Sequence, residues 1–354
     1  MQTMKTVLMR DNRVHVEEVP VPEPGTGQVL VKSRACGICG SDLHITLHAQ
    51  EIFEFFKEVG TLEPDRSTDG MAISLGHEFC AEVVSYGPHT RRQLAPGQRV
   101  TSVPFLVTEQ GQLGVGVNPD VYGAYSEYFL LNEDLLLPVP DGLPDEAVAM
   151  TEPMAVGLHA VNHGTVGVDE VALVAGCGSI GLACIVALKR QGVKTIIASD
   201  PREGNWALAR ELGATHVVNP VRQDEIRLAA ELAGAEGVVI LECVGLPSMI
   251  PDFIRRAPAK ARIVFAGLHT SEVAFAPAHA MAKELTVKYS FYYESEEFAE
   301  CLQALADGDV AWQGFCTGKV GINGVPAAFD ELMQPNNHIK VVVEPWRAGA
   351  LRPA

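Results

Sequence analysis

The sequence lacks any long apolar run, although 47% of its 354 residues are hydrophobic. A helix that crosses a bilayer needs about 20 consecutive apolar residues. The opening stretch, MQTMKTVLMRDNR, also lacks the apolar block of a secretory signal. We therefore expect a cytoplasmic protein with no membrane partner.

Positive charge is scarce as well. There are 27 Lys and Arg against 44 Asp and Glu, which gives a formal net charge of −17 with histidine neutral. Nucleic acids and anionic membrane surfaces attract proteins through basic residues, so neither is an expected partner. The acidic residues are spread along the chain without forming a tail, and we interpret them as a source of solubility.

A second CxxC motif is missing. Eight cysteines are present, but only Cys36 and Cys39 form such a pair, and none occurs between Cys80 and Cys177. A structural zinc site of four cysteines usually needs two pairs. A disulfide framework is not expected in a long chain without an export signal. Most of the thiols, Cys36 included, should therefore be buried core groups.

The length and the pattern of the chain predict two domains. Short strand-like runs and turn residues, such as Asp11 and Asn12, dominate the first 131 residues. From Val171 strands and helices alternate, which predicts a parallel sheet with helices on both faces. We predict an α/β protein with a Rossmann doubly wound domain at 156–292 and a β-rich domain at 1–155 and 293–354.

Potential metal donors gather in three short stretches. RACGICGSDLH, residues 34–44, is punctuated by glycine and carries a thiol, a hydroxyl, a carboxylate and an imidazole at Cys39, Ser41, Asp42 and His44. GHEFC at 76–80 and MTEPMAVG at 150–157 add three further donors at His77, Glu78 and Glu152. A carboxylate in an apolar stretch is costly unless it is paired, hydrogen-bonded or bound to a metal. These donor types predict a metal site that includes Cys39.

The stretch GCGSIG at 176–181 predicts a phosphate-binding turn. It follows a strand, opens a helix, and precedes Asp200 by 200 − 181 = 19 residues. Gly176 would allow the tight turn, Gly178 the approach of a pyrophosphate, and Gly181 the packing of helix on strand. Asp200 would accept hydrogen bonds from the adenosine ribose, which favours NAD over NADP, although Arg202 lies nearby.

Residues 46–70 include a predicted amphipathic helix. Ile52, Phe55, Phe56 and Val59 fall at i, i+3, i+4 and i+7 and define its apolar face. An ordinary packed helix and a lid over an apolar substrate pocket are the two interpretations.

These stretches, in this order, resemble the zinc-dependent medium-chain dehydrogenase/reductase family, which includes alcohol, sorbitol and threonine dehydrogenases. The resemblance extends over residues 5–345 and is carried by GICGSDLH, GHE, TEPMAVGLHA and GCGSIG with Asp200. It implies a GroES-like catalytic domain beside the Rossmann domain. It also implies a homodimer or homotetramer, with the strand near 285–293 as a candidate seam.

The resemblance assigns roles to individual residues. Cys39 and His77 would bind a catalytic zinc ion, with Glu78 or Glu152 as the third protein ligand. Ser41 and His44 match a proton relay, and Asp42 matches a carboxylate behind the zinc ligands. The residues implied in cofactor binding are Gly176, Gly178, Ser179, Ile180, Gly181, Asp200, Arg202, Cys243, Val244 and Lys340, the last near the pyrophosphate.

The sequence departs from the family at three points. A cysteine-rich structural zinc lobe is absent, so we expect one zinc ion per chain. The segment from Cys39 to His77, 77 − 39 = 38 residues, is longer than in typical members. Ile45 and Tyr292 stand where sorbitol dehydrogenases carry a tyrosine and an arginine that bind polyol hydroxyls. Candidate substrate residues are Ile45, Phe55, Phe56, Phe105, Leu106, Phe291 and Tyr292.

The expected reaction is NAD-linked interconversion of a small-molecule alcohol and its ketone or aldehyde, by hydride transfer from a zinc-bound alkoxide. A secondary or bulky hydrophobic alcohol is expected, with a polyol- or threonine-type activity as the alternative. Binding of both glutamates would make the zinc site anionic, so we predict that only one binds tightly. A zinc-free reductase and a non-catalytic dinucleotide-binding sensor remain competing hypotheses, although the intact donor set weighs against both.

Overall fold

The computed structural model describes residues 2–109 and 111–354. Its contacts divide the chain into two compact units, of which the first comprises residues 1–152, 302–307 and 312–354. The second comprises residues 153–301 and 308–311. The sequence analysis expected the boundaries between the two domains at 155/156 and 292/293. In the structure the boundary between the units near residue 301 lies inside helix α10 (Ser295–Ala306).

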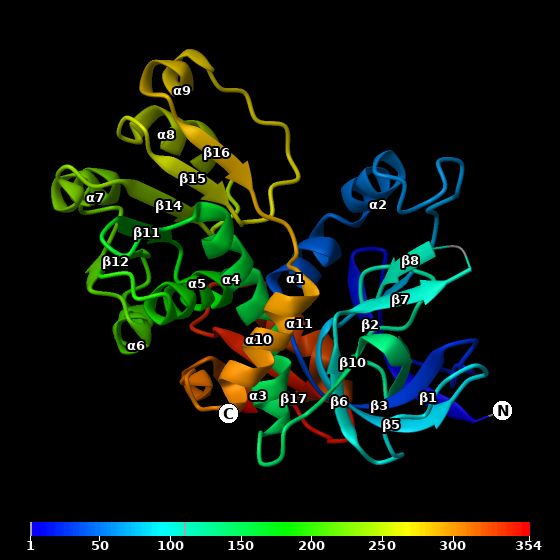
Figure 1. Cartoon of the computed structure of the whole chain (residues 1–354). Helices are drawn as coiled ribbons and strands as arrows, with labels where there is room; N and C mark the ends of the chain where they lie inside the picture. Colours follow the sequence, from blue (N-terminus) through cyan, green and yellow to red (C-terminus); the bar gives the residue numbers. More distant parts are fainter. Residues whose placement is uncertain (1, 110) are drawn as a thin grey trace. The chain divides into compact units, whose positions relative to one another are not determined.

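The first unit is rich in strands (Figure 1). Its main sheet runs β10-β6-β5-β3-β18-β17-β19, with β9 also paired to β3, within the part of the chain that is described. Smaller sheets join β2-β1-β4 and β7-β8. The strands are β1 (Thr3–Arg10), β2 (Arg13–Pro20), β3 (Gln28–Gly37), β4 (Ile73–Ser74), β5 (Glu78–Tyr86), β6 (Arg99–Ser102), β7 (Phe105–Thr108), β8 (Gly111–Gly114), β9 (Tyr128–Asn132), β10 (Leu136–Pro138), β17 (Cys316–Gly321), β18 (Lys340–Glu344) and β19 (Arg352–Pro353).

The helical segments of the first unit are α1 (Gly40–Leu47), α2 (Ala49–Glu58), η1 (Glu133–Leu135), α3 (Asp145–Ala149), η3 (Trp312–Gly314), η4 (Ile322–Gly324) and α11 (Val325–Leu332). The β1–β2 hairpin turns at Asp11 and Asn12, whose φ angles are 51° and 59°. Two positive φ values suit a two-residue turn between strands, and Asn and Asp tolerate them. Strand β18, from the far end of the chain, pairs antiparallel with β3, where Val342 faces Gly37.

Helix α2 is present, and half of its predicted apolar face is correct, because Ile52 is buried and Phe56 packs against the core. Its buried residues are Ala49, Ile52 and Phe53, whereas Phe55 is 49% exposed and Val59 is 56% exposed. The spacing i, i+3, i+4 and i+7 therefore starts at residue 49 and not at 52. The small side chain of Ala49 carries a weak sequence signal, while its burial is decided by the core against which the helix packs.

The second unit is built around one parallel sheet in the order β13-β12-β11-β14-β15-β16 (Figure 1). Strands β11 and β14 are buried along their whole length, as expected for a sheet covered on both faces. Its strands are β11 (Val171–Ala175), β12 (Thr195–Ser199), β13 (His216–Val218), β14 (Val238–Glu242), β15 (Arg262–Phe265) and β16 (Thr286–Tyr289). This order, with its reversal between β11 and β14, is that of a Rossmann fold.

The helices of the second unit connect these strands and flank the sheet. They are α4 (Thr151–Gly164), α5 (Ser179–Arg190), η2 (Glu203–Asn205), α6 (Trp206–Leu212), α7 (Glu225–Ala233), α8 (Met249–Arg256), α9 (Ala278–Lys283) and most of α10. Strand β16 forms an edge of the sheet, and three of its four residues are exposed. None of the described helices combines the length and the apolarity that crossing a membrane requires.

Candidate active site

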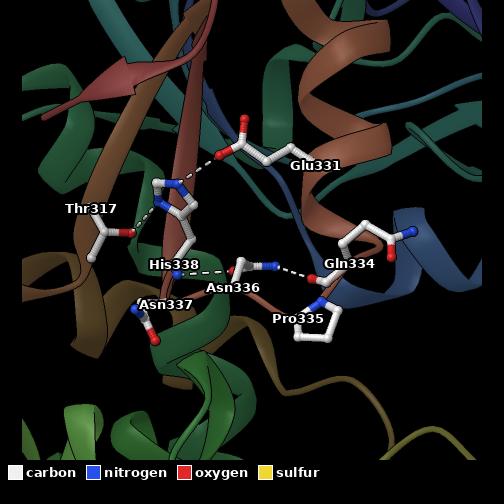
Figure 2. Close-up of a pocket in the computed structure, with 7 residues that line it drawn as sticks. All are labelled: Thr317, Glu331, Gln334, Pro335, Asn336, Asn337 and His338. Carbon is white, nitrogen blue, oxygen red and sulfur yellow. Dashed lines mark hydrogen bonds and ion pairs between the residues drawn. The ribbon is translucent and has the colours of Figure 1, made fainter.

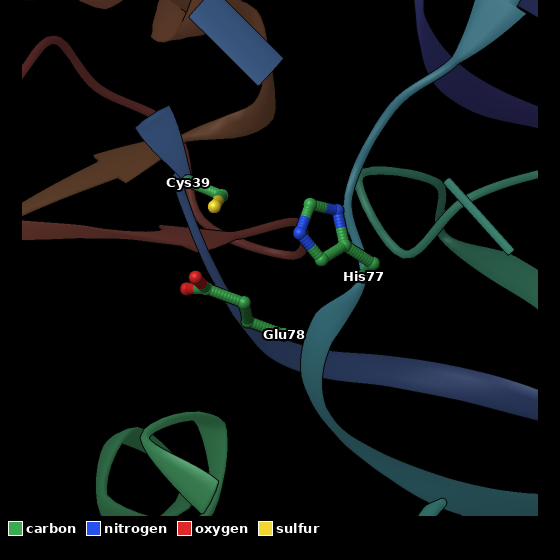
Figure 3. Close-up of side chains that lie close together, drawn as sticks. All are labelled: Cys39, His77 and Glu78. Carbon is green, nitrogen blue, oxygen red and sulfur yellow. The ribbon is translucent and has the colours of Figure 1, made fainter. Parts of the chain in front are cut away.

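Three potential metal ligands converge in the first unit. Strands β3 and β5 pair with Gly37 opposite Glu78, which brings Cys39, two residues beyond β3, to the start of β5. One donor atom each from Cys39, His77 and Glu78 lies within 4.8 Å of the others. Figure 3 shows the three side chains gathered where these strands meet.

The surroundings of these donors suit a cation. Glu78 is fully buried, and its Oε2 atom has no hydrogen-bond partner among the described residues. A Cβ atom at position 37 would lie 2.0 Å from that oxygen, so only glycine leaves room for it. Thiolate sulfur, imidazole nitrogen and carboxylate oxygen are the atoms that bind zinc in proteins, and a catalytic site takes three protein ligands. The residues therefore fit a zinc ion.

Asp42 contacts two of the potential metal ligands and helps to position them. It is fully buried, and its Oδ2 atom accepts hydrogen bonds from the backbone N–H of Cys39 (2.9 Å) and the hydroxyl of Tyr125 (2.7 Å). Its Oδ1 atom lies 3.5 Å from Nδ1 of His77. The Nε2 atom of His77 is thereby left to the donor cluster, 3.5 Å from the hydroxyl of Ser41.

Charge around His77 favours a proton on the free imidazole. Burial alone lowers the pKa of His77, but the carboxylate of Asp42 and the side chain of Cys39 outweigh it and raise that pKa well above its ordinary value. A metal ion must displace this proton, because imidazole binds metals through its neutral form.

Lys340 lies in this site as well. Its ammonium is 2.6 Å from Oε1 of Glu78, and both side chains are almost completely buried. Burial lowers the pKa of Lys340, yet the charges of Glu78 and Cys39 raise it above the usual range. The resemblance implies a place for Lys340 near the pyrophosphate, and the structure adds an ion pair between Lys340 and Glu78. The reason is that β18 pairs with β3, which no local pattern reveals.

Glu152 is close to this cluster without belonging to it. It is the second residue of α4 and 6% exposed, and its charge contributes to the raised pKa of Lys340. Among the described residues, the convergent donor group contains Glu78 and not Glu152.

The two residues matched to a proton relay lie on α1. Ser41 faces His77, and the half-buried ring of His44 lies 4.6 Å from that of His48. Burial and the neighbouring His48 lower the pKa of His44. A neutral imidazole at neutral pH can accept a proton.

The glycine motif in the second unit has the geometry of a phosphate cradle. Gly176 has a φ of 94°. A Cβ at Gly181 would lie 1.8 Å from the carbonyl oxygen of Gly176, whereas a Cβ at Gly178 would meet nothing within 4 Å. Gly178 precedes helix α5, whose first residues are Ser179 and Ile180. The open approach at Gly178 and the helix N-terminus behind it suit a pyrophosphate.

Asp200 follows β12 as predicted, but its carboxylate is already engaged. It accepts hydrogen bonds from the backbone N–H groups of Cys177 and Arg202, both at 2.7 Å. The guanidinium of Arg202 binds both carboxylate oxygens at 3.1 Å. Arg202 is half exposed while Asp200 is 2% exposed, so the accessible part of this pair is cationic.

Strand β14 ends at Glu242, a buried acid that the sequence analysis did not single out, and the turn after it contains two predicted cofactor residues. The thiol of Cys243 lies 3.8 Å from that of Cys184, and Val244 is 44% exposed. The backbone N–H of Val244 donates to the buried carboxylate of Glu242, which in turn contacts His269. An acidic residue ending an apolar strand, GVVILE, was the available signal.

The predicted substrate residues differ in exposure, and they belong to both units. Ile45 and Leu106 are buried, and Phe56 packs against the core of the first unit. Phe55 and Phe291 are exposed, the latter at 85%. Phe105 is partly buried on β7, and Tyr292 has a φ of 64° and stacks on Tyr293 at 4.2 Å.

A separate hollow of about 570 Å³ lies in the first unit (Figure 2). It is lined by Thr317, Glu331, Gln334, Pro335, Asn336, Asn337 and His338. The imidazole of His338 lies 3.2 Å from Oγ1 of Thr317 and 3.8 Å from Glu331. None of the predicted site residues lines this hollow.

Fold and site together fit a class of protein, namely dinucleotide-dependent oxidoreductases that also hold a metal. Comparison with known families agrees with this class. Residues 25–141 match an alcohol dehydrogenase GroES-like domain, and residues 179–307 match a zinc-binding dehydrogenase domain.

Individual relatives match along almost the whole chain. The (R,R)-butanediol dehydrogenase of Bacillus subtilis is 29% identical, over 94% of this chain and 96% of the relative. The sorbitol dehydrogenase of the same organism is 26% identical over 98% of both chains. A putative zinc-binding dehydrogenase of Sinorhizobium meliloti, solved with NADP, has a TM-score of 0.82 and 28% identity, covering 98% of this chain and 100% of that one.

The chain belongs to the zinc-dependent medium-chain dehydrogenase/reductase family. It is an oxidoreductase of the alcohol and polyol dehydrogenase type. The family and the fold class predicted from the sequence are thus confirmed.

Proposed function

We propose that this enzyme oxidises a secondary alcohol to a ketone, and reduces the ketone in reverse, with NAD as the hydride carrier and one zinc ion per chain. The convergence of Cys39, His77 and Glu78 carries this proposal. A zinc ion held there would act as a Lewis acid on the alcohol oxygen and favour loss of its proton.

We propose Glu78, rather than Glu152, as the third protein ligand. Its buried Oε2 atom has no other partner among the described residues, and it belongs to the convergent group. Lys340 also contributes to the charge balance. With neutral His77, a zinc ion, two anionic ligands, Lys340 and the buried carboxylate of Asp42 give 2 − 2 + 1 − 1 = 0. Lys340 therefore offsets Asp42, and the site stays neutral, as the sequence analysis expected.

The chain's own residues supply a route for the proton. Ser41 lies beside the donor cluster and would accept the proton from the alcohol, and His44 would receive it later. The lowered pKa of His44 supports this role, because a neutral imidazole is present to accept a proton at neutral pH. Asp42 would hold His77 and Cys39 in position throughout.

A secondary alcohol is favoured by the relatives. The name (R,R)-butanediol dehydrogenase implies a substrate with two stereocentres, and the hydroxyls of such a diol are secondary. The sorbitol dehydrogenase relative keeps a polyol as the second candidate. Ile45, which is buried in the core, offers no polar group to a polyol, so we favour a less polar alcohol.

The proposal can be tested with an absorbance screen. Zinc-loaded enzyme is mixed with NAD and, in turn, a secondary alcohol, a vicinal diol, a primary alcohol and sorbitol, and NADH formation is followed at its absorption band. Metal analysis of the same sample should give about one zinc per chain. Fastest turnover of a secondary alcohol supports the proposal. Equal turnover of all four, or full activity after chelation of the metal, contradicts it.

We also propose a homodimer that uses strand β16. This strand forms an edge of the sheet, and its exposed backbone could pair with a second copy. Replacing Val287 by Pro should reduce the mass measured by light scattering to that of one chain. An unchanged mass would exclude this seam.

A further inference from the structure

A buried carboxylate and a buried imidazole meet beyond the carboxyl ends of β14 and β15. Glu242 is the last residue of β14 and is fully buried. His269 lies four residues after the end of β15. Its Nε2 atom is 2.8 Å from Oε2 of Glu242, and its side chain is 8% exposed.

The backbone around Glu242 is built to hold this carboxylate. Its Oε1 atom accepts hydrogen bonds from the backbone N–H groups of Val244 (2.7 Å) and Gly245 (2.9 Å). A Cβ at Gly267 would lie 2.3 Å from the backbone nitrogen of Gly245 and 2.9 Å from Oε2 of Glu242. The carboxylate thus ties the turn after β14 to the loop after β15.

This arrangement fixes the role of each nitrogen of His269. An ionised carboxylate only accepts hydrogen bonds, so Nε2 carries the proton that it donates to Glu242. In neutral imidazole, Nδ1 is then an acceptor. That atom is buried and has no hydrogen-bond partner among the described residues. A buried acceptor costs free energy unless it is satisfied, so a donor from a bound molecule would stabilise it.

The position of the pair in the sheet indicates the ligand. The strand order reverses between β11 and β14, and dinucleotides bind at the carboxyl ends of the strands on both sides of such a point. The glycine motif follows β11 and Asp200 follows β12, on the side that receives the adenosine half. Glu242 and His269 follow β14 and β15, on the side that remains for the nicotinamide half.

We propose that Nδ1 of His269 accepts a hydrogen bond from the nicotinamide half of the dinucleotide, while Glu242 fixes the orientation of the ring. The donors on that half are the ribose hydroxyls and the carboxamide N–H groups. This inference rests on the proposed function, because it requires a bound nicotinamide dinucleotide.

Two substitutions separate this role from a structural one. In His269→Gln the terminal amide nitrogen can replace Nε2 and keep the bond to Glu242, but the acceptor at Nδ1 is lost. In His269→Asn the amide oxygen can replace Nδ1, but the bond to Glu242 is lost. The probes are NADH, NADPH and ADP, titrated by calorimetry, and ADP lacks the nicotinamide half altogether.

We expect His269→Gln to raise the Kd of whichever reduced dinucleotide the wild type binds better by about five- to tenfold, the effect of one lost hydrogen bond. In the same variant, the Kd of ADP should change by less than about twofold. His269→Asn should bind the dinucleotide more tightly than His269→Gln. It should melt at a lower temperature than His269→Gln, because it loses the bond to Glu242.

Each contrary result has a distinct meaning. Wild-type affinity of His269→Gln for the dinucleotide overturns the inference and leaves the proposed function intact. Equal weakening of dinucleotide and ADP also overturns it, because the residue would then be purely structural. A wild-type protein that binds ADP but neither NADH nor NADPH removes the proposed function, and the inference with it.

Discussion

The two units build their sites from different material. In the first, side chains from distant parts of the chain meet through strand pairing, and the Glu78–Lys340 contact joins residues 262 positions apart. In the second, the cradle at Gly176–Gly181 is a local backbone shape that six consecutive residues specify. Substitutions at the first site should therefore act by removing charges and metal ligands. Substitutions in the glycine cradle should act by filling the space beside the backbone.

The largest expected effect is at the metal ligand. Cys39→Ser replaces a thiolate by a neutral hydroxyl and should lower kcat/KM by at least about 10³-fold, because several kcal/mol of Lewis-acid stabilisation are lost with the metal. Metal analysis should show the zinc lost, while calorimetric titration with ADP stays unchanged. Cys36→Ser is the control, because Cys36 is buried in the core and does not belong to the donor group. This variant should still bind zinc.

Lys340→Met tests the buried ion pair of the first unit. It leaves Glu78 charged and unpaired, which should lower the free energy of unfolding by about 3–5 kcal/mol in the metal-free protein. Zinc should reduce the loss, because it compensates the same carboxylate. Urea unfolding with and without chelator measures both values.

Lys319→Met is the matched control for this experiment. Lys319 pairs with Glu146 in the same unit, but both side chains are partly exposed. Its removal should cost less than about 1 kcal/mol, with no dependence on zinc. Equal losses in the two variants would contradict the distinction between these pairs.

Two alanines in the glycine cradle separate folding from binding in the second unit. Gly181→Ala forces a Cβ against the carbonyl of Gly176 and should cost about 1–3 kcal/mol of stability. Gly178→Ala meets no protein atom, so its melting temperature should match the wild type while its Kd for NADH rises. The opposite pattern in thermal unfolding and calorimetry would exclude these roles.

The smallest expected effect concerns cofactor choice. Arg202→Ala removes the exposed cation beside Asp200 and should increase the preference for NADH over NADPH by about fivefold, because a nearby arginine can accommodate the 2′-phosphate. The ratio of kcat/KM values for the two cofactors measures this. Arg210→Ala, on helix α6, is the control substitution and should leave the ratio unchanged. A ratio that stays constant would mean that Arg202 serves only to hold Asp200.

Several features were predictable because their signals are local. The glycine spacing at 176–181, the acid at Asp200 and the donors Cys39, His77 and Glu78 are all readable from short stretches. The choice of face on α2 was not, because the sets that start at residues 49 and 52 share Ile52 and Phe56 and fit the same helical period. Which set is buried depends on the core, not on the helix.

The sequence by itself determined the two-unit α/β architecture, the glycine turn at 176–181 and the identity of the candidate zinc donors, because residue type and short-range spacing carry that information. Only the tertiary structure decided that Glu78 joins Cys39 and His77, that Lys340 neutralises Glu78, and that Arg202 occupies the carboxylate of Asp200. Charges interact through space, and the distances that set their strength arise from strand pairing and side-chain packing that no single stretch encodes.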